Sequence, residues 1–383
     1  MPTLAGLAQV RPRDLRIELS NELAVARALR QDRPLATYIG WTGQGNLGDE
    51  ILLEAHERLF PGLSLVPFQR LEVAARIAAR RSRGPGFTAG FLGGGTLINQ
   101  SVTWLKRTQQ LLDRGLPVGC LGAGVQTPEF QHDFERTQLA DWAPVLRELE
   151  FLGVRGPRSA EILADAGIDV EITGDPALAL APEEAPTPAP VPGTIGFNLG
   201  VSGKTLMYGS PQRFLDAAVE TIRQLTAAGH QVRLLPVTAA DLPSNEQVLE
   251  RVGHPECVLH RCWGSYAAYA AATRSCEVFV GQKLHATVIA ITQRVPSVML
   301  SYQPKCDDFM ASIGQRDAVL RTDEFTAERA TLVIEELRWS GELMANELDA
   351  AVRWFRKRQH ELAAELAPRL GSAPGVEPAG SGA

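Results

Sequence analysis

Short apolar runs alternate with amphipathic segments along most of the chain, and the alternation has the same character in both halves. We predict buried strands at 34–41, 86–95, 117–124 and 150–156 in the first half and at 194–200, 231–237, 276–282 and 296–302 in the second. Strands separated by helices form parallel sheets, because a parallel neighbour is reached through a right-handed helical crossover. The pattern therefore predicts an α/β fold in each half.

A proline-rich segment, APEEAPTPAPVPG at 181–193, separates the two halves. Proline lacks the N–H group that helices and sheets need, so we predict an extended linker and a domain boundary there. A length of 383 residues with 45% apolar content also suits two cores better than one. The predicted divisions are a helical extension at 1–33, a first Rossmann-like domain at 34–180, the linker at 181–193, a second Rossmann-like domain at 194–340, a helix at 341–370 and a disordered tail at 371–383.

The helix predicted at 341–370 carries apolar residues on one face, which indicates packing on the body of the protein. A basic run, RWFRKR at 353–358, lies within this helix. It suits either a membrane surface or a solvated face, and we favour the solvated face. The apolar positions are Met344, Leu348, Val352, Phe355, Leu362 and Leu366.

The charge of the chain excludes one class of partner. Its formal net charge is −6, so it exerts no long-range attraction on nucleic acid, and any bound anion must be held by a local site. No stretch reaches the roughly 20 apolar residues that span a bilayer, and the N-terminus lacks the apolar centre of a secretion signal. We expect a cytoplasmic protein without integral membrane contact.

The five cysteines are odd in number and scattered through apolar runs, as reduced core thiols are. Cys257 and Cys262 lie near His254 and His260, but no second ligand pair has the spacing of a zinc site. We predict no metal.

A first glycine-rich loop, with glycines at 43, 45 and 48, joins a strand to an amphipathic helix. Such a loop presents backbone N–H groups and the positive end of a helix dipole, which suits a phosphate or carboxylate. It lacks the Lys-Ser/Thr ending of a Walker loop, and Asp49 and Glu50 would repel a pyrophosphate. Glu50 equally fits a role of favouring the helix dipole. Asp49 with Asn46 lies where open α/β sheets bind ligands, so we predict that both belong to the site.

A second glycine-rich loop, FLGGGTLINQ, follows the next buried strand. Its glycines favour a close approach of the backbone to a ligand or to the other domain, and Gly94 and Gly95 are candidate binding residues. The alternative is a tight turn with a helix cap at Thr96. Trp41 and Trp104 near these loops suit either stacking on a sugar or structural packing.

Seven motifs follow one another along the chain: GNLGDE (45–50), LGGGTL (92–97), LGAGVQTP (121–128), GVRGPRSAEILADAGI (153–168), TGDPAL (173–178), KLHATVIA (283–290) and VPSVMLSYQPKCDDF (295–309). They run in the order found in the polysaccharide pyruvyl transferases, and the chain resembles this family from about residue 38 to 310. The resemblance implies a GT-B-like arrangement of two Rossmann-like domains with the site in the cleft. It also implies transfer of the enolpyruvyl group of phosphoenolpyruvate onto two hydroxyls of a saccharide, giving a pyruvate ketal and phosphate.

The resemblance also implies which residues bind the donor. The family's arginine in its VR motif corresponds to Arg155, its Arg-Leu-His triplet to Lys283, Leu284 and His285, and the aspartate of its first loop to Asp49. The first residue of the triplet departs from the family, because a lysine keeps the positive charge but not the bidentate fork of arginine. An exposed lysine at a helix start is the structural alternative.

A mechanism follows from these assignments as a hypothesis. His285 is the candidate acid or phosphate partner and Asp49 the candidate base for the attacking hydroxyl. Arg155 and Lys283 would neutralise the carboxylate and the leaving phosphate, and Lys305 would meet phosphate or acceptor from the same rim. Phosphoenolpyruvate is then a substrate, and no further cofactor is predicted.

Three other positions leave alternatives open. Asp175 in TGDPAL suits a hinge or cap as well as catalysis. Gln126 and Thr127 differ from the residues of many relatives, so acceptor recognition is expected to be altered. The acceptor itself is open, whether a lipid-linked saccharide, a nucleotide-linked sugar or a small glycosylated metabolite.

Two rival functions share the same architecture. A nucleotide-sugar glycosyltransferase of this plan would place a carboxylate in the helix after the seventh strand, and LHATVIAITQRVP offers none. A catalytically silent binding relative is the second rival, with Lys283 as its only sign.

Overall fold

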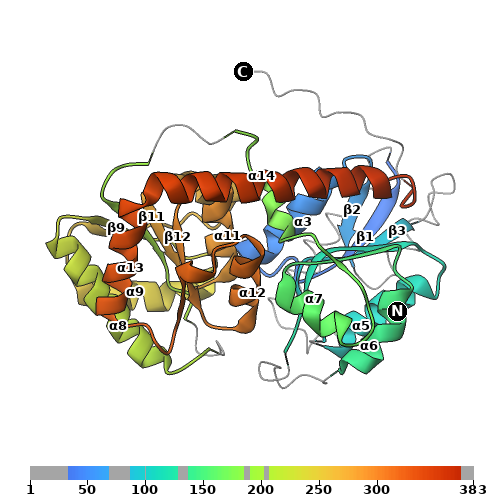
Figure 1. Ribbon diagram of the computed structural model, residues 1–383, viewed down its shortest axis with the longest axis horizontal. Coiled ribbons are helices and arrows are strands. Elements are labelled where there is room, and N and C mark those ends of the chain that lie inside the picture. Colours follow the sequence, from blue (N-terminus) through green and yellow to red (C-terminus); the bar gives the residue numbers. More distant parts are fainter. Residues whose placement is uncertain are drawn as a thin grey trace, which may run out of the picture.

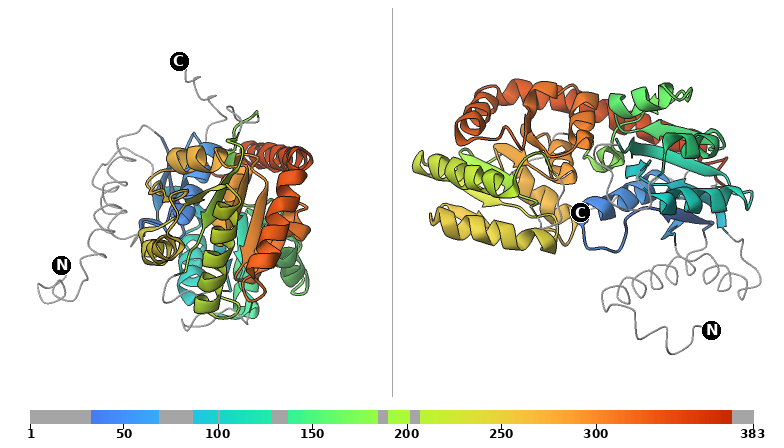
Figure 2. Two further views of the ribbon diagram at one scale, coloured as in Figure 1. Left: turned by 90° about the vertical axis from the view of Figure 1, so that its left-hand side faces the viewer. Right: turned by 90° about the horizontal axis from the view of Figure 1, so that it is seen from below.

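The computed structural model describes residues 33–68, 87–99, 101–127, 137–184, 190–201 and 207–371, which form two α/β lobes lying side by side (Figures 1 and 2). The first lobe comprises the described residues from 33 to 184, and the second those from 190 to 340. The extension predicted at 1–33 and the tail predicted at 371–383 lie almost wholly outside the described residues.

The first lobe is built on a seven-stranded parallel sheet, in the order β2-β1-β3-β5-β6-β7 with β4 beside β5. Its strands are β1 (Leu35–Ile39), β2 (Ser64–Pro67), β3 (Phe87–Leu92), β4 (Gly95–Ile98), β5 (Val118–Val125), β6 (Phe151–Val154) and β7 (Glu171–Ile172). Its helices are α3 (Leu47–Leu59), α5 (Val102–Leu112), α6 (Leu139–Arg147), α7 (Pro157–Ala164) and the short 3-10 helix η2 (Pro176–Leu180).

The second lobe repeats the plan with a six-stranded parallel sheet, in the order β10-β9-β8-β11-β12-β13. Its strands are β8 (Thr194–Asn198), β9 (Gln231–Leu234), β10 (Cys257–Leu259), β11 (Val278–Gly281), β12 (Ser297–Ser301) and β13 (Val319–Arg321). Its helices are α8 (Pro211–Ala227), α9 (Leu242–Val252), α10 (Tyr266–Arg274), α11 (Leu284–Thr292), α12 (Pro304–Ser312) and α13 (Ala327–Trp339), with 3-10 turns η3 (Ala239–Asp241) and η4 (Arg316–Ala318).

Each sheet has a point where the strand order changes direction, between β1 and β3 in the first lobe and between β8 and β11 in the second. Loops leaving the carboxyl ends of such neighbouring strands diverge, and the crevice between them is where open α/β sheets bind ligands. Both glycine-rich loops leave the first of these points, and the Lys-Leu-His triplet leaves the second. The topology therefore directs the predicted site loops to the junction of the lobes.

The long helix α14 (Gly341–Leu366) starts beside the second lobe and runs back across the first (Figure 1). Leu348, Val352, Phe355, Leu362 and Leu366 are buried along one face, which confirms the predicted apolar face. They join an apolar cluster that includes residues of both lobes. No helix in the part of the chain that the structure describes combines the length and apolarity needed to cross a membrane.

Candidate active site

The first turn of α3 lies directly against the first turn of α11. A methyl group added at Gly48 would lie only 2.5 Å from Nδ1 of His285, so no larger residue fits at this contact. The backbone N–H of Leu47 donates to the carbonyl of Val237 at 3.1 Å, and Asn46 forms an isolated bridge with Thr238. The first glycine-rich loop is therefore docked on the second lobe.

Asn46 fixes Asp49 at this contact. Its amide oxygen accepts from the N–H of Gly48 at 3.1 Å as the helix cap, and its Nδ2 donates to Oδ2 of Asp49 at 2.6 Å. Burial raises the pKa of Asp49, while the charges of His285, Lys305 and neighbouring cations act against the rise. A carboxylate whose pKa is raised accepts a proton more readily than one with the usual pKa of aspartate.

The glycine loop itself serves the protein. The N–H groups of Gly43 and Gly45 face the carboxylate of Glu50, whose pKa is raised by burial and lowered by these hydrogen bonds. Both glycines have positive φ, 74° and 70°, which favours glycine there. Glu50 thus competes with a ligand for the N–H groups of these two glycines, and their use as donors to a ligand stays a prediction.

His285 is paired with Asp175 from the first lobe. The two residues approach to 3.6 Å between Nε2 and Oδ2, and the side chain of Asp175 is fully buried. Burial alone would raise the pKa of Asp175, but interaction with His285 and Arg155 brings it below its usual range. Asp175 also accepts from the N–H of Ala177 at 3.0 Å, so it caps η2 and orients the histidine at once.

Arg155 is buried at the end of β6, with 1% of its surface exposed. Its Nη2 donates to Oγ1 of Thr96 at 3.3 Å. Its Nε and Nη1 have no hydrogen-bond partner among the described residues. A buried cation with unpaired donors is costly unless a ligand completes it, so this guanidinium is suited to an anion.

Gly124 and Thr96 both lie against the side chain of Arg155. Gly124 has no room for a side chain, because the guanidinium lies against it. Thr96 lies in β4 and binds Arg155, and α5 begins later with Ser101 as its cap. The alternative of a helix cap at Thr96 is therefore wrong.

Lys283 extends into the junction from the cap position of α11. Its backbone N–H donates to Oδ1 of Asn198 at 2.9 Å, and its stem lies against Gly200. Its Nζ is 3.9 Å from Oδ1 of Asp241, whose side chain is completely buried. Lys283 is thus a partly buried cation held by a carboxylate, which excludes the alternative of an exposed lysine.

Lys305 lies in the first turn of α12, with Nζ 4.8 Å from the ring centre of Tyr302. Nζ of Lys283 is 6.0 Å from the same ring. Burial lowers the pKa of Lys305 to about 8, and repulsion from Lys283 and Arg155 adds to the effect. Lys305, Lys283 and Arg155 are therefore close enough for their charges to affect one another. The carboxylate of Asp49 also interacts with the two lysines.

Three predicted binding residues have packing roles in the structure. Leu284 is buried in the apolar cluster shared by the lobes. A methyl at Gly94 would lie 2.9 Å from Leu52 and 3.0 Å from Pro176, and Gly95 has a φ of 89°. Direct contact of these three residues with substrate stays a prediction.

The tryptophans divide between the two roles considered for them. Trp104 is buried, whereas Trp41 is 41% exposed, and their rings meet edge to face at 5.4 Å. Only Trp41 is accessible to a ligand.

Sequence reasoning missed Asp241, Tyr302 and Asp308, which support this site. Asp241 and Tyr302 follow the ends of β9 and β12, and that position was the available signal. Asp308 reaches across from α12 to α7, accepting from the N–H of Arg158 at 2.8 Å and the hydroxyl of Ser159 at 2.7 Å. The signal for it was a helix that starts at Gly-Pro without a cap of its own.

Solved structures similar to this one belong to two-domain enzymes of the GT-B type. A structure titled S. aureus MnaA with UDP has a TM-score of 0.56 at 10% identity, covering 88% of this chain and 97% of that one. UDP-GlcNAc 2-epimerase from Neisseria meningitidis has a TM-score of 0.56 at 9% identity, covering 88% and 100%. A UDP-glucosyltransferase from Polygonum tinctorium has a TM-score of 0.51 at 13% identity, covering 89% and 99%. At these identities the likeness shows the fold alone.

Sequence comparison is more specific. No curated protein sequence matches the chain. The sequence model of the polysaccharide pyruvyl transferases matches residues 46–304, a span that includes Asp49, Arg155, Asp175 and the Lys-Leu-His triplet. Because the match extends over most of the chain and through both lobes, the protein belongs to the polysaccharide pyruvyl transferase family.

Proposed function

We propose that the protein transfers the enolpyruvyl group of phosphoenolpyruvate to two hydroxyls of a saccharide, forming a pyruvate ketal and releasing phosphate. The observation that carries the proposal is the buried guanidinium of Arg155, with two donor atoms lacking partners among the described residues. Lys283 and Lys305 are electrostatically coupled to the same place. A small donor with a carboxylate and a phosphate supplies the negative charge that this arrangement lacks.

In this proposal, arginine and lysine bind different groups of phosphoenolpyruvate. The Arg155 fork suits the planar carboxylate, which it can bind through two parallel hydrogen bonds. Lys283 and Lys305 suit the phosphate, because an ammonium group acts as a point charge and tolerates several orientations. The lysines also stabilise the charge that develops on phosphate as it leaves.

The reaction balances with two proton transfers. One proton goes to the methylene carbon, which becomes a methyl group, and the adjacent carbon becomes electrophilic. One hydroxyl adds, the bond to phosphate breaks, and the second hydroxyl closes the ketal. Of the two hydroxyl protons released, one replaces the proton supplied to carbon and the other leaves on phosphate.

His285 and Asp49 are the proposed proton carriers. His285 lies 3.6 Å from Asp175, whose pKa is held below its usual range by His285 and Arg155, and this carboxylate orients the ring. Asp49, held by Asn46 and raised in pKa by burial, accepts the proton of the attacking hydroxyl. Their closeness across Gly48 allows donation and acceptance on neighbouring parts of one small substrate.

A nucleotide-linked sugar is one acceptor that we consider. The S. aureus and N. meningitidis structures are described with UDP or UDP-GlcNAc bound. A lipid-linked saccharide or a small glycosylated metabolite also provides the paired hydroxyls.

The test compares binding of phosphoenolpyruvate and of UDP-glucose by thermal shift, followed by an assay of phosphate release with saccharide acceptors. Phosphoenolpyruvate should raise the Tm, and Arg155→Met should remove that shift while Arg147→Met, on an exposed helix end, should not. His285→Ala should bind the donor and release no phosphate. Stabilisation by UDP-glucose without any by phosphoenolpyruvate would contradict the proposal and favour a glycosyltransferase. Donor binding without phosphate release by the wild type would favour a silent relative.

A further inference from the structure

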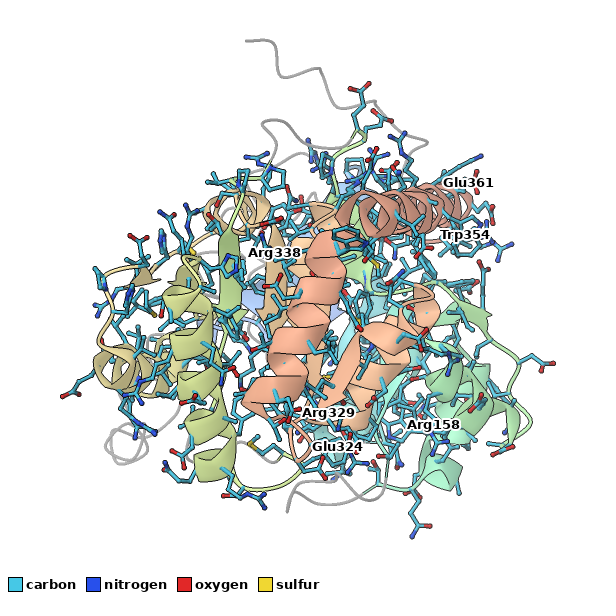
Figure 3. The ribbon with its side chains drawn as sticks, turned by 60° about the vertical axis from the view of Figure 1, so that its left-hand side comes forward. Arg158, Glu324, Arg329, Arg338, Trp354 and Glu361 are labelled. Atoms are coloured by element: carbon cyan, nitrogen blue, oxygen red, sulfur yellow. The ribbon has the colours of Figure 1, made fainter. Side chains whose placement is uncertain are left out.

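A pocket of about 510 Å³ lies between the lobes, walled by α7 on one side and α12 on the other. In Figure 3, Arg158 lies where α7 approaches α12. The volume falls within the usual range for small-molecule sites, roughly 300–1,000 Å³. Among its lining residues are Thr127, Arg158, Glu161, Tyr208, Asp307 and Arg316.

The pocket adjoins the candidate active site through the starts of the same two helices. Arg158 lies in the first turn of α7, three residues after Arg155. Asp307 lies in the first turn of α12, two residues after Lys305. In each lobe, the start of one helix therefore carries both a candidate donor-binding cation and a residue that lines the pocket. The helix is α7 in the first lobe and α12 in the second. The pocket lining is therefore linked to the donor-site cations through two short stretches of chain, 155–158 and 305–307.

The walls of the pocket are held in place by a contact between the lobes. Asp308 is 3% exposed and binds the first turn of α7 through Arg158 and Ser159. Gly156 has no room for a side chain because Asp308 lies against it. The pocket is consequently formed before any ligand arrives, which limits the entropy lost on binding.

The lining has the chemistry of a site for hydroxyl groups. Arg158, Arg316 and Glu161 have no ion-pair partner among the described residues, so their donors and acceptors remain available. Asp307 accepts from the hydroxyl of Ser301 at 2.7 Å and retains a second carboxylate oxygen. Tyr208 adds an aromatic ring, on which the guanidinium of Arg321 lies at 4.2 Å.

We propose that this pocket binds a pyranose ring of the saccharide acceptor, an assignment that rests on the proposed function. Three carboxylates, at Glu161, Asp307 and Asp308, outnumber the two arginines in the lining, so the pocket repels a polyanion. A neutral ring with many hydroxyls uses carboxylate acceptors and guanidinium donors together. The free sugar, a sugar nucleotide and a glycolipid share this ring, and the pocket recognises the ring itself.

The test fills the pocket without touching the donor residues. Ala311 lines it, so Ala311→Trp should occupy it, whereas Ser312→Trp changes the next residue, which lies outside the lining. Methyl pyranosides of glucose, galactose and mannose, with UDP-glucose and UDP-galactose as a second arm, are titrated by saturation-transfer NMR. At least one should bind the wild type and Ser312→Trp, and bind Ala311→Trp at least tenfold more weakly. Affinity for phosphoenolpyruvate should stay within about twofold in all three proteins.

Glu161→Gln provides a second variant at an exposed position that should fold normally. It should weaken binding of the same sugar about tenfold, and Asp165→Asn at the other end of α7 should not. Failure of every sugar to bind the wild type, or equal binding by Ala311→Trp, would overturn the assignment. Sugar binding that Ala311→Trp removes, in a protein that does not bind phosphoenolpyruvate, would refute the proposed donor and leave the pocket as a saccharide site.

Discussion

At the scale of single residues, Lys283 keeps the positive charge of the arginine expected at this position but not its bidentate geometry. The stem of Lys283 passes beside Gly200, and its Nζ lies 3.9 Å from the buried Asp241. Burial raises the pKa of Asp241, and the lysine opposes that rise. The cation therefore has a partner within the protein, besides the donor anion that we propose for it.

Replacing Lys283 with alanine should weaken binding of phosphoenolpyruvate roughly tenfold to a hundredfold, because a contact to a charged group contributes about 1.5–3 kcal/mol. It should also lower the Tm, since Asp241 would be left as a buried carboxylate without its cation. Adding Asp241→Asn should restore the Tm and leave binding weak. Calorimetric titration and thermal melts of both variants check this, and recovery of binding in the double variant would count against a donor contact.

The lowered pKa of Lys305 predicts a pH dependence. The side chain is positive below about pH 8 and neutral above it, so affinity for the anionic donor should fall as the pH rises through 8, by up to about tenfold per unit. Lys305→Arg should bind equally at pH 7 and 9, because arginine stays charged. Dissociation constants measured from pH 6.5 to 9.5 decide the matter, and a profile that is the same for both proteins would refute the assignment.

At the scale of secondary structure elements, helix starts do most of the positioning. The first turns of α3 and α11 meet at Gly48 and His285, and α7 receives its cap from the other lobe. A helix start carries unpaired N–H groups, so it attracts a carboxylate. Here that attraction joins the two lobes at the helix that directly follows Arg155.

Asp308→Ala should remove this cap and cost about 0.5–2 kcal/mol of stability, the usual loss for a capping side chain. It should also raise the KM for phosphoenolpyruvate, because Arg155 directly precedes α7. Asp308→Asn, which keeps one acceptor, should recover part of both effects. Steady-state kinetics and urea unfolding are the measurements, with Asp317→Ala on an exposed turn as the control. A lower kcat with unchanged KM would indicate another role for Asp308.

At the scale of the whole molecule, α14 joins the lobes behind the site. Arg294 of the second lobe pairs with Asp349 at 2.9 Å, and Gln359 donates to the carbonyls of Thr173 and Asp175 at 2.8 and 2.9 Å. The carbonyl of Leu370, just beyond the helix, accepts from the hydroxyl of Thr88 at 3.4 Å. The segment that orients His285 is therefore supported by a helix from the far end of the chain.

Phe355→Ala should cost about 3–5 kcal/mol, as large-to-small changes in a core do. A methyl group at Gly174 would lie 2.6 Å from this ring, so the substitution opens a cavity beside Asp175. Activity should fall along with stability. Trp339→Ala is the control, since Trp339 is 95% exposed at the end of α13 and should change the Tm little. Denaturant unfolding compares the two, and equal losses would contradict a specific contact behind the site.

The strand pattern and the order of the motifs were sufficient to predict the fold class and the family. Buried parallel strands read as apolar runs because both faces of the sheet are covered, and this signal located eight of the thirteen strands in the described residues. The edge strands β2, β7, β10 and β13 were not predicted. The short β4 within the second glycine loop escaped this reasoning, because a strand of four residues beginning with glycine carries little apolar signal. Because β4 was not recognised, Thr96 was considered as a helix cap, whereas it lies within this strand.

By itself the sequence determined the two α/β halves and the motifs at the ends of their strands, because burial and turn formation depend on neighbouring residues. Only the tertiary structure decided that Asp175 orients His285 and that Asp308 caps a helix of the other lobe. These contacts join residues far apart in the chain. Their geometry follows from how the lobes dock, which no local pattern encodes.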